Sequence, residues 1–261
     1  MRSWALAGVA LALLAGCDRT PAASEPRKPH RVLRTTVLVE DMIYLRGDAN
    51  QRLLAFLRKR YGDAALLGAP WKGDWEDTEV EALRPVTRSV CARDTVTSEG
   101  HEQTLLAVCQ TLDDAATVEP GRVDLYVLRL GKDDDEASHG GALAQQLAND
   151  PLVVIAQRLQ EQYGRHGAPG TVQIAQLGPQ RHAFHITHEE HRRGHRRIWR
   201  SYVALHNDRL RDVAQYRDHL DNLALHGCDG NPADCGEGVF SVDFSTTVGD
   251  SNAVDGYWPL T

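Results

Sequence analysis

The stretch Thr171–Leu177, TVQIAQL, begins a region in which apolar and polar residues alternate. Four more strand-like stretches follow it, separated by short polar turns, at residues 182–188, 198–205, 209–216 and 239–247. Alternation with a period of two is typical of strands that turn one face toward a core, and short turns join such strands in antiparallel order. The sequence therefore predicts an antiparallel β-meander over residues 166–261.

The preceding residues, 32–165, combine helical and strand patterns. A helix is predicted over residues 51–61, with Asp48 as its N-cap and Gly62 at its end. Its apolar positions recur at helical spacing: Leu53, Leu54, Leu57 and Tyr61. Strands are expected at residues 32–45, 86–92, 104–112 and 122–130, and a loop at residues 68–76.

A second helix is predicted over residues 142–163, with a break at Asn149-Asp150-Pro151. An apolar stripe at helical spacing follows the break: Leu152, Ile155, Leu159 and Tyr163. The predicted fold class is therefore α+β, with an N-terminal helix-containing part that carries a disulfide-stapled β-hairpin, followed by a C-terminal antiparallel β-meander. Residues 32–165 and 166–261 form either two regions or one continuous domain.

The beginning of the chain has the organisation of an export signal. Arg2 supplies a positive charge, the run Trp4–Leu14 is apolar, and the sequence then continues Ala15-Gly16-Cys17. An apolar run this short cannot cross a hydrocarbon core of about 30 Å, and it matches the central part of a signal peptide. The order Leu-Ala-Gly-Cys resembles the lipobox of bacterial lipoproteins. The alternative is an ordinary signal peptide with a Cys nearby.

The lipobox resemblance implies that residues 1–16 are removed and that Cys17 is acylated with fatty acids such as palmitate. The protein would then be anchored in the lipid bilayer, on the periplasmic face of the cell membrane. Residues 17–31 carry the lipidated Cys and a flexible tether rich in Pro, Ser and Ala. Asp18 resembles the inner-membrane retention signal of many Gram-negative lipoproteins, so we expect the inner membrane.

Four cysteines remain once Cys17 is lipidated, and an even number in an exported chain indicates disulfides. Three pairings are possible, of which Cys91–Cys109 and Cys228–Cys235 close the shortest loops. We therefore expect these two disulfides, which by loop-closure entropy contribute about 3 and about 2.5 kcal/mol. Neither pair has the C-x-x-C spacing of zinc sites or thioredoxin-like motifs.

Five histidines lie within one short segment: His182, His185, His188, His191 and His195. On a strand, His182 and His188 share a face with Phe184, whereas His185 points the other way. A turn at residues 192–194 would bring His195 back beside His188 or His191. Imidazoles that converge in this way are the usual ligands of Zn²⁺, Ni²⁺ or Cu²⁺.

Two other interpretations of the histidine segment stay open. Several arginines surround the imidazoles and would repel a cation: Arg181, Arg192, Arg193, Arg196 and Arg197. The segment is then either a polar hairpin that faces water, which we favour, or a patch for anions or proteins. Such a patch would bind more strongly below pH 6.5, where histidine gains charge.

Composition and motifs narrow the function class. The formal net charge is −7 at pH 7, and an acidic chain is a poor binder of nucleic acid. The sequence contains no G-x-S-x-G elbow, no G-x-x-x-x-G-K-[ST] loop and no G-x-G-x-x-G after a strand. We therefore assign no catalytic residue and expect no cofactor apart from a metal at the histidine segment.

These observations rank three functions. The leading hypothesis is a membrane-anchored periplasmic lipoprotein that acts as a non-catalytic binding or envelope protein, with a protein partner in the envelope. The alternative is a divalent-metal-binding lipoprotein that uses residues 182–195. A hydrolase with a dispersed active site is third, because catalytic triads converge in space and not in sequence.

Overall fold

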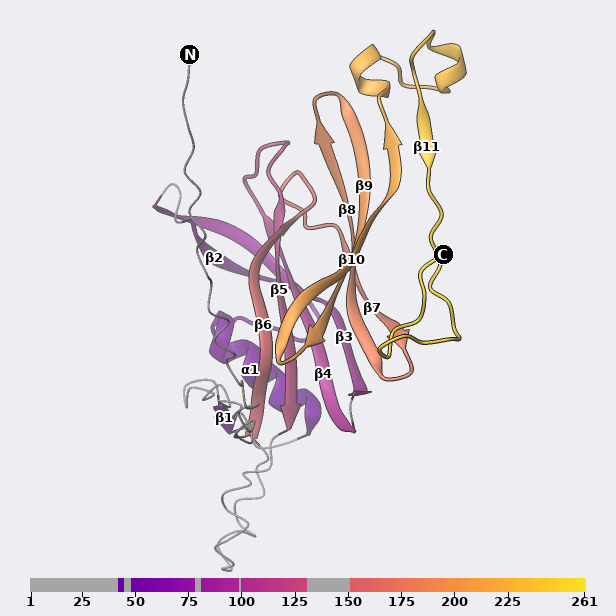
Figure 1. Ribbon diagram of the computed structural model, residues 1–261. Helices are drawn as coiled ribbons and strands as arrows, with labels where there is room; N and C mark the ends of the chain where they lie inside the picture. Colours follow the sequence, from indigo (N-terminus) through magenta and orange to yellow (C-terminus); the bar gives the residue numbers. More distant parts are fainter. Residues whose placement is uncertain (1–41, 45–47, 78–80, 99, 131–150) are drawn as a thin grey trace, which may run out of the picture. The chain divides into compact units, whose positions relative to one another are not determined.

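Figure 1 shows the computed structural model of the chain, which describes residues 42–44, 48–77, 81–98, 100–130 and 151–261. The chain divides into two compact units, Met1–Thr36 and Val37–Thr261, and every described residue belongs to the second unit. The expected signal peptide, Cys17, the tether and most of the strand predicted at residues 32–45 therefore lie outside the described residues.

Two antiparallel sheets make up most of the described chain (Figure 1). The first sheet has the order β1-β6-β5-β4-β3-β2, and its strands are β1 (Met42–Tyr44), β2 (Trp71–Asp77), β3 (Ala82–Ser98), β4 (His101–Leu112), β5 (Gly121–Leu130) and β6 (Pro151–Tyr163). The second sheet has the order β11-β10-β9-β8-β7, and its strands are β7 (Thr171–Gly178), β8 (Arg181–Arg192), β9 (His195–His206), β10 (Arg209–Asp221) and β11 (Ser241–Asp243).

Three helices accompany the sheets in the described part of the chain: α1 (Ala49–Tyr61) and the short 3₁₀ helices η3 (Leu223–His226) and η4 (Pro232–Asp234). None of these helices is long and apolar enough to cross a membrane. The predicted α+β class with a C-terminal meander is confirmed, because β7 to β10 follow one another along the chain and pair in that order. Residue 165 lies between β6, the last strand of the first sheet along the chain, and β7, the first strand of the second.

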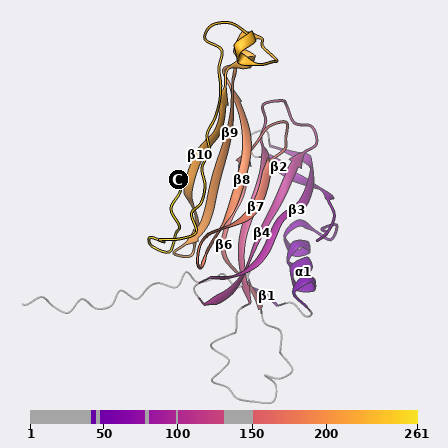
Figure 2. The same cartoon turned by 90° about the vertical axis from the view of Figure 1, so that its right-hand side faces the viewer.

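The two sheets face each other and share one apolar core (Figure 2). Leu125 and Val127 of the first sheet pack there with Phe184, Ile186 and Val203 of the second, and all five are fully buried. Burial of an apolar side chain of this size contributes roughly 1.5–3 kcal/mol. The shared core is therefore the main source of contact between the two halves of the sequence.

Helix α1 covers the opposite face of the first sheet, as Figure 2 shows. The Asp48 side chain caps the helix by accepting a hydrogen bond from the Gln51 backbone N–H at 2.9 Å, and Gly62, at a φ of 88°, ends it. Phe56 is fully buried, and its ring packs edge to face with the Tyr126 ring, with the two ring centroids 5.2 Å apart. Because both faces of the first sheet are covered, β4 carries an unbroken buried run, residues 105–110, instead of alternation.

Two segments differ from the sequence-based prediction because of strand pairing. Residues 68–76 were expected to form a loop, but Trp71–Asp77 is strand β2, the edge strand beside β3. Trp71 packs in the core under α1, and the Trp75 ring lies 4.6 Å from the Arg122 guanidinium. Tertiary contacts therefore hold a Gly- and Trp-rich stretch in extended form.

The helix predicted over residues 142–163 is wrong where the structure describes it. Pro151–Tyr163 is strand β6, which pairs with β5 along its length, and residues 142–150 lie outside the described ranges. The β-branched run Val153-Val154-Ile155 favours a strand, and pairing satisfies the edge of β5. The last predicted strand, residues 239–247, is reduced to Ser241–Asp243.

Both expected disulfides are formed. Cys91 and Cys109 join β3 to β4, with their Cα atoms 5.6 Å apart, and confirm the stapled hairpin. Cys228 and Cys235, at 5.9 Å, close the connection between β10 and β11 that contains η3 and η4. The first disulfide lies in the shared core, and the second restrains a surface connection.

Candidate anion-binding site at the β8–β9 hairpin

The histidine segment forms a long β-hairpin made of β8 and β9. Its two-residue turn is Arg193-Gly194, and both residues have positive φ, 54° and 74°. Such turns match the twist of the flanking strands. A side chain at Gly194 would also lie 2.8 Å from the Leu225 Cβ atom, so glycine is required there by contact as well as conformation.

The hairpin distributes the five histidines over both faces of the second sheet. His182 and His188 share the inner face with Phe184, and His185 lies on the opposite face, as the alternation predicts. The predicted turn is present, but the cross-strand partner of His195 is Arg192. His191 pairs across the strands with Arg196, so His195 does not lie directly opposite another histidine.

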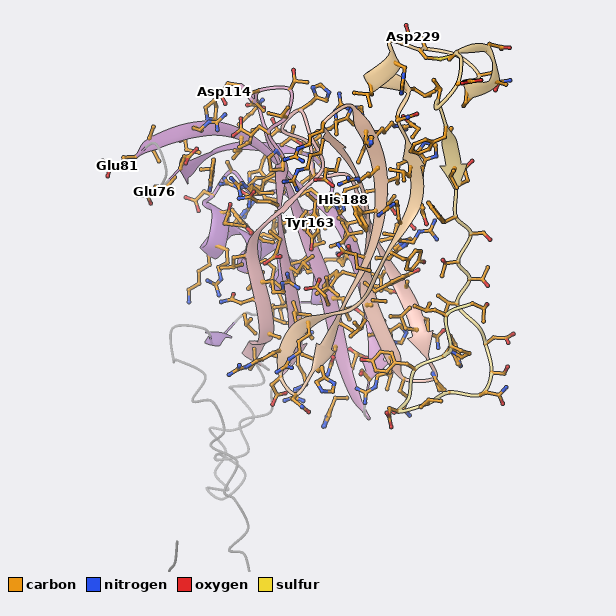
Figure 3. All side chains as sticks on the ribbon, turned by 45° about the horizontal axis from the view of Figure 1, so that its top comes forward. Glu76, Glu81, Asp114, Tyr163, His188 and Asp229 are labelled. Carbon is orange, nitrogen blue, oxygen red and sulfur yellow. A yellow bond between two sulfur atoms is a disulfide. The ribbon has the colours of Figure 1, made fainter. Side chains whose placement is uncertain are left out.

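Ring contacts involve some of these imidazoles, and the Nδ1 atoms of His182, His188 and His195 are buried without a hydrogen-bond partner among the described residues. The rings of His185 and Tyr202 stack with their centroids 4.8 Å apart. The ring centroids of His188 and Tyr163, both labelled in Figure 3, are 5.2 Å apart. Burial lowers the pKa values of His182, His185 and His188. Within the described ranges, no three or more His, Cys, Asp or Glu side chains are placed to hold a metal ion.

The two glutamates of the segment take part in ion pairs. Glu189 accepts hydrogen bonds from Arg165 at 3.1 Å and from His191 at 2.5 Å, and it also pairs with Arg196 at 3.2 Å. Burial alone would raise the pKa of Glu189, but His191 and Arg196 lower it. Glu190 accepts a hydrogen bond from the Trp199 indole at 3.0 Å. Both carboxylates are therefore already engaged.

The end of the hairpin is basic. A depression of about 450 Å³ is lined by four residues, and we call this surface the basic tip: Arg192, Arg193, His195 and Arg197. Among the described residues, neither Arg192 nor Arg193 forms an ion pair, and both are exposed. Arg197 forms an ion pair with Glu190, with Nη1 3.6 Å from Oε2, but the Arg197 Nε atom is buried without a hydrogen-bond partner among the described residues. The basic tip therefore presents two arginines, Arg192 and Arg193, that no acidic side chain of the described residues neutralises.

A histidine outside the segment has a more ordered environment. His219 of β10 lies between two carboxylates, with Nε2 2.7 Å from Asp221 and Nδ1 2.6 Å from Asp243 of β11. The hydrogen bond to Asp243 raises the pKa of His219; burial opposes this, and Asp221 adds to it. Both ring nitrogens are occupied, so His219 clamps β11 to β10 and is not free to act as a base. The i, i+2 spacing of His219 and Asp221 was visible in the sequence, but the position of Asp243 was not.

A second polar group that the sequence did not indicate lies between α1 and the first sheet. We call it the Asp124 cluster: Tyr61, Arg88, Gln110, Asp124 and Tyr126. Asp124 accepts hydrogen bonds from Tyr61 at 2.7 Å and from Gln110 at 3.0 Å, and Gln110 in turn accepts one from Arg88 at 2.8 Å.

Burial dominates the electrostatics of the Asp124 cluster. It raises the pKa of Asp124, although hydrogen bonds from Gln160 and Tyr61 act in the opposite direction. Burial also raises the pKa of Tyr61, together with the neighbouring Tyr126 and Asp124. The cluster is enclosed and its groups are bonded to one another, so it joins α1 to strands β3, β4 and β5.

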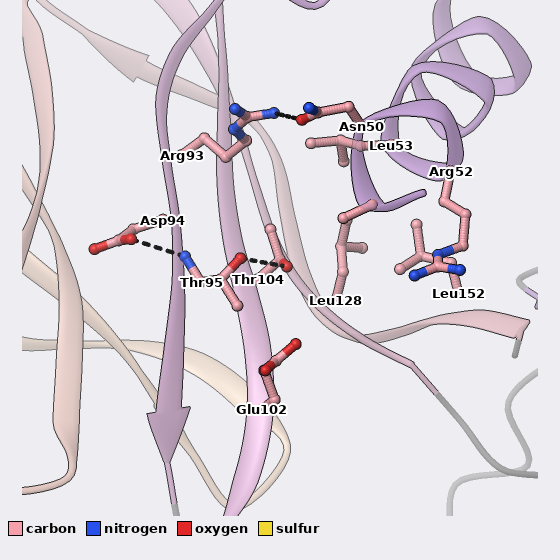
Figure 4. Close-up of a pocket in the computed structure, with 11 residues that line it drawn as sticks. Asn50, Arg52, Leu53, Arg93, Asp94, Thr95, Glu102, Thr104, Leu128 and Leu152 are labelled. Atoms are coloured by element: carbon pink, nitrogen blue, oxygen red, sulfur yellow. Dashed lines mark hydrogen bonds between the residues drawn. The ribbon is translucent and has the colours of Figure 1, made fainter. Parts of the chain in front are cut away.

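A cavity of about 310 Å³ lies beside the first turn of α1 (Figure 4). Arg52 and Arg93 line it together with Asp94 and Glu102, over an apolar floor that includes Leu128. Arg93 donates a hydrogen bond to the Asn50 side chain at 2.9 Å. Acidic and basic side chains line this cavity together, and Arg93 is already bonded to Asn50, unlike the exposed arginines of the basic tip.

Comparison with other proteins adds no assignment. The chain matches no protein-family model, and searches among curated proteins and solved structures gave no match.

Proposed function

We propose that this chain is a lipid-anchored protein of the bacterial cell envelope that binds an acidic protein partner through the basic tip. The observation that carries the proposal is a depression lined only by Arg192, Arg193, His195 and Arg197 in a chain with a formal net charge of −7. Unpaired arginines concentrated at one end of an acidic molecule steer anionic partners toward that end.

The basic tip lies far from the first described strand. Strand β1 pairs with the beginning of β6, whereas Arg165, just after the end of β6, contacts Glu189 near the tip. A strand with the length of β6 spans roughly 40 Å. About this distance separates β1, at the start of β6, from the basic tip, near its end.

The openness of the site favours a protein surface over a small molecule. Arg192 and Arg193 are exposed at a turn, and the depression is not enclosed by apolar walls. Small-molecule sites are usually concave and mostly apolar, whereas charged groups at the rim of a protein interface set partner choice and association rate. The metal-binding alternative has no comparable observation in its favour.

The acidic-partner proposal is tested with a defined acidic probe. The full chain in neutral detergent is titrated into a rhodamine-labelled oligoglutamate peptide, and binding is followed by fluorescence anisotropy. We expect the Arg192→Glu/Arg193→Glu variant to bind at least about tenfold more weakly, because two attractive charges become repulsive.

The matched control is Arg58→Glu/Arg209→Glu, which changes the net charge equally at two exposed arginines away from the tip. Its affinity should stay within about twofold of wild type, since exposed charges farther than a Debye length of about 10 Å are screened. Equal losses in both double variants would show that attraction is non-specific and would overturn the assignment to the basic tip.

Lipid anchoring is tested at Cys17. Cells that express the chain are fed an alkyne fatty acid, and the labelled protein is detected after coupling to a fluorophore. The Cys17→Ser variant should lose the label and accumulate as an uncleaved precursor or a wrongly processed soluble form. The reason is that two or more acyl chains, at roughly 0.8 kcal/mol per buried CH₂, hold a lipoprotein on its membrane. Labelling of the Cys17→Ser variant as strong as that of wild type would contradict the anchor.

A further inference from the structure

A cleft of about 530 Å³ lies on the outer face of the second sheet, away from the basic tip. Its floor includes Tyr202 of β9 and Ala214 of β10, and its wall is the C-terminal segment, with Val254, Tyr257, Trp258 and Leu260. We call this space the C-terminal cleft. Its volume falls within the range of about 300–1,000 Å³ that is usual for small-molecule sites.

The wall of the C-terminal cleft is held in place by backbone contacts. The Trp258 N–H donates a hydrogen bond to the Leu177 carbonyl at 2.7 Å, and the Gly249 N–H donates one to the Pro259 carbonyl at 2.8 Å. A Cβ atom at Gly178 would lie 1.8 Å from the Gly256 carbonyl oxygen, so the segment approaches β7 as closely as glycine allows. The cleft therefore has two ordered sides.

Exposed apolar side chains gather at the C-terminal cleft. Val254 is 71% exposed, Leu260 is 41% exposed and Val213 is 36% exposed. Val213 stands at a register shift between Asp212 and Ala214, where a β-bulge turns an extra side chain out of the ladder. These residues leave apolar surface open to water beside the Tyr257 and Trp258 rings, which favours an occupant with an apolar body.

One end of the C-terminal cleft is cationic. His206 and Arg211 line it near the β9–β10 turn, and both are exposed. Two carboxylates also line the cleft: Asp212, which pairs with Arg158 at 3.0 Å, and Asp255 of the C-terminal wall. In the described part of the chain, neither forms an ion pair with Arg211. An apolar space that ends at an unneutralised guanidinium is complementary to a molecule with an apolar body and one anionic group.

We propose that the C-terminal cleft binds a small amphiphilic anion, with its apolar body between Tyr202, Ala214 and the C-terminal wall and its carboxylate at Arg211. This site is independent of the basic tip, which is open, lacks apolar walls and contains no residue of the cleft. The chain therefore has one surface for an acidic macromolecule and a separate cleft for a small ligand.

The experiment uses 4-phenylbutyrate as the probe and 4-phenylbutanol as its neutral counterpart. Binding to the full chain in neutral detergent is measured by saturation-transfer NMR titration. In the Ala214→Phe variant, the larger side chain fills the floor of the cleft and displaces the phenyl group of either probe. Both probes should then bind about tenfold or more weakly, because the phenyl group loses the free energy of burial in the cleft. The matched control is Val118→Phe, at a residue 79% exposed in a turn outside the cleft, which should leave both affinities unchanged.

A second variant tests the anionic end without altering the core. Arg211→Gln should weaken 4-phenylbutyrate about tenfold, as expected for a lost charge-assisted hydrogen bond, and leave 4-phenylbutanol unchanged. Equal affinity of wild type and Ala214→Phe for both probes would overturn the assignment of binding to the C-terminal cleft. An equal effect of Arg211→Gln on both probes would overturn the anionic selectivity. The Arg192→Glu/Arg193→Glu variant should bind both probes normally, so failure of the cleft and failure of the basic tip are distinguishable.

Discussion

The Asp124 cluster and the basic tip are both rich in polar side chains, but their surroundings differ. Asp124 is 2% exposed and receives hydrogen bonds from Tyr61, Gln110 and the Gln160 backbone. Arg192 is exposed at the end of β8, next to the turn, and has no acidic partner among the described residues. One group of polar residues is satisfied within the fold, and the other is left to interact with something outside it.

This difference follows from how each sheet is covered. The first sheet lies between the shared core and α1, so a polar group on either face must be paired internally. The second sheet has one face in the core and only part of the other face covered by the C-terminal segment. The molecule thus carries its internal polar network on the first sheet and its candidate binding surfaces on the second.

The largest expected effect is on the Asp124 cluster. Asp124→Ala should lower the free energy of unfolding by about 3 kcal/mol, because Tyr61, Gln110 and the Gln160 N–H lose a buried acceptor. Thermal or urea denaturation measures the loss. The control is Asp229→Ala at an exposed position, which should change stability by less than about 0.5 kcal/mol. Similar small effects of both substitutions would mean that the Asp124 cluster does not hold α1 on the sheet.

A smaller effect is expected from two histidines of the second sheet, His219 and His188, which should change the pH dependence of stability in opposite directions. The pKa of His219 is raised, so its contribution to stability is present below the unfolded pKa of about 6.5 and is lost as the pH rises through the folded pKa. The pKa of His188 is lowered by burial, so the fold is destabilised as the pH falls below about 6.5. The charged groups around His219 are Asp221, Asp243 and, through Asp221, Arg196 at 3.7 Å.

Denaturation of His219→Gln and His188→Gln across pH 5 to 9 measures these opposite dependences. Relative to wild type, His219→Gln should lose about 1 kcal/mol of stability at acidic pH and little at alkaline pH. The loss is small because the Asp243 carboxylate is largely exposed, so solvent screens its attraction to His219. His188→Gln should reduce the loss of stability on acidification. Parallel pH profiles for the two variants would show that Asp221 and Asp243 do not retain the proton on His219.

Local sequence patterns predicted the structure correctly where residues close together in the sequence decide the conformation. Asp48 and Gly62 mark the ends of α1 because capping depends on residues close in sequence. The pairing of Cys91 with Cys109 followed from two adjacent strands joined by a short turn at Gly100. The alternation around His182, Phe184 and His188 predicted which face of β8 each side chain occupies.

The same local patterns failed where a partner strand decides the conformation. Leu152, Ile155, Leu159 and Tyr163 have helical spacing, yet pairing with β5 makes this segment a strand. Trp71–Asp77 lacks alternation in its sequence, and its extended form depends on β3. Short-range spacing cannot distinguish these outcomes, because the free energy of strand pairing comes from residues distant along the chain.

The sequence by itself determined the α+β class, the C-terminal meander, the first helix and the two cysteine pairs, because each follows from periodicity, capping or proximity along the chain. Only the tertiary structure decided which charges are neutralised. The glutamates near the histidines are paired with Arg165, Arg196 and Trp199, whereas Arg192 and Arg193 at the turn are not. It also placed Val254 and Trp258 across the outer face of β9 and β10. Neutralisation and enclosure both depend on distances between strands, and strand register sets those distances.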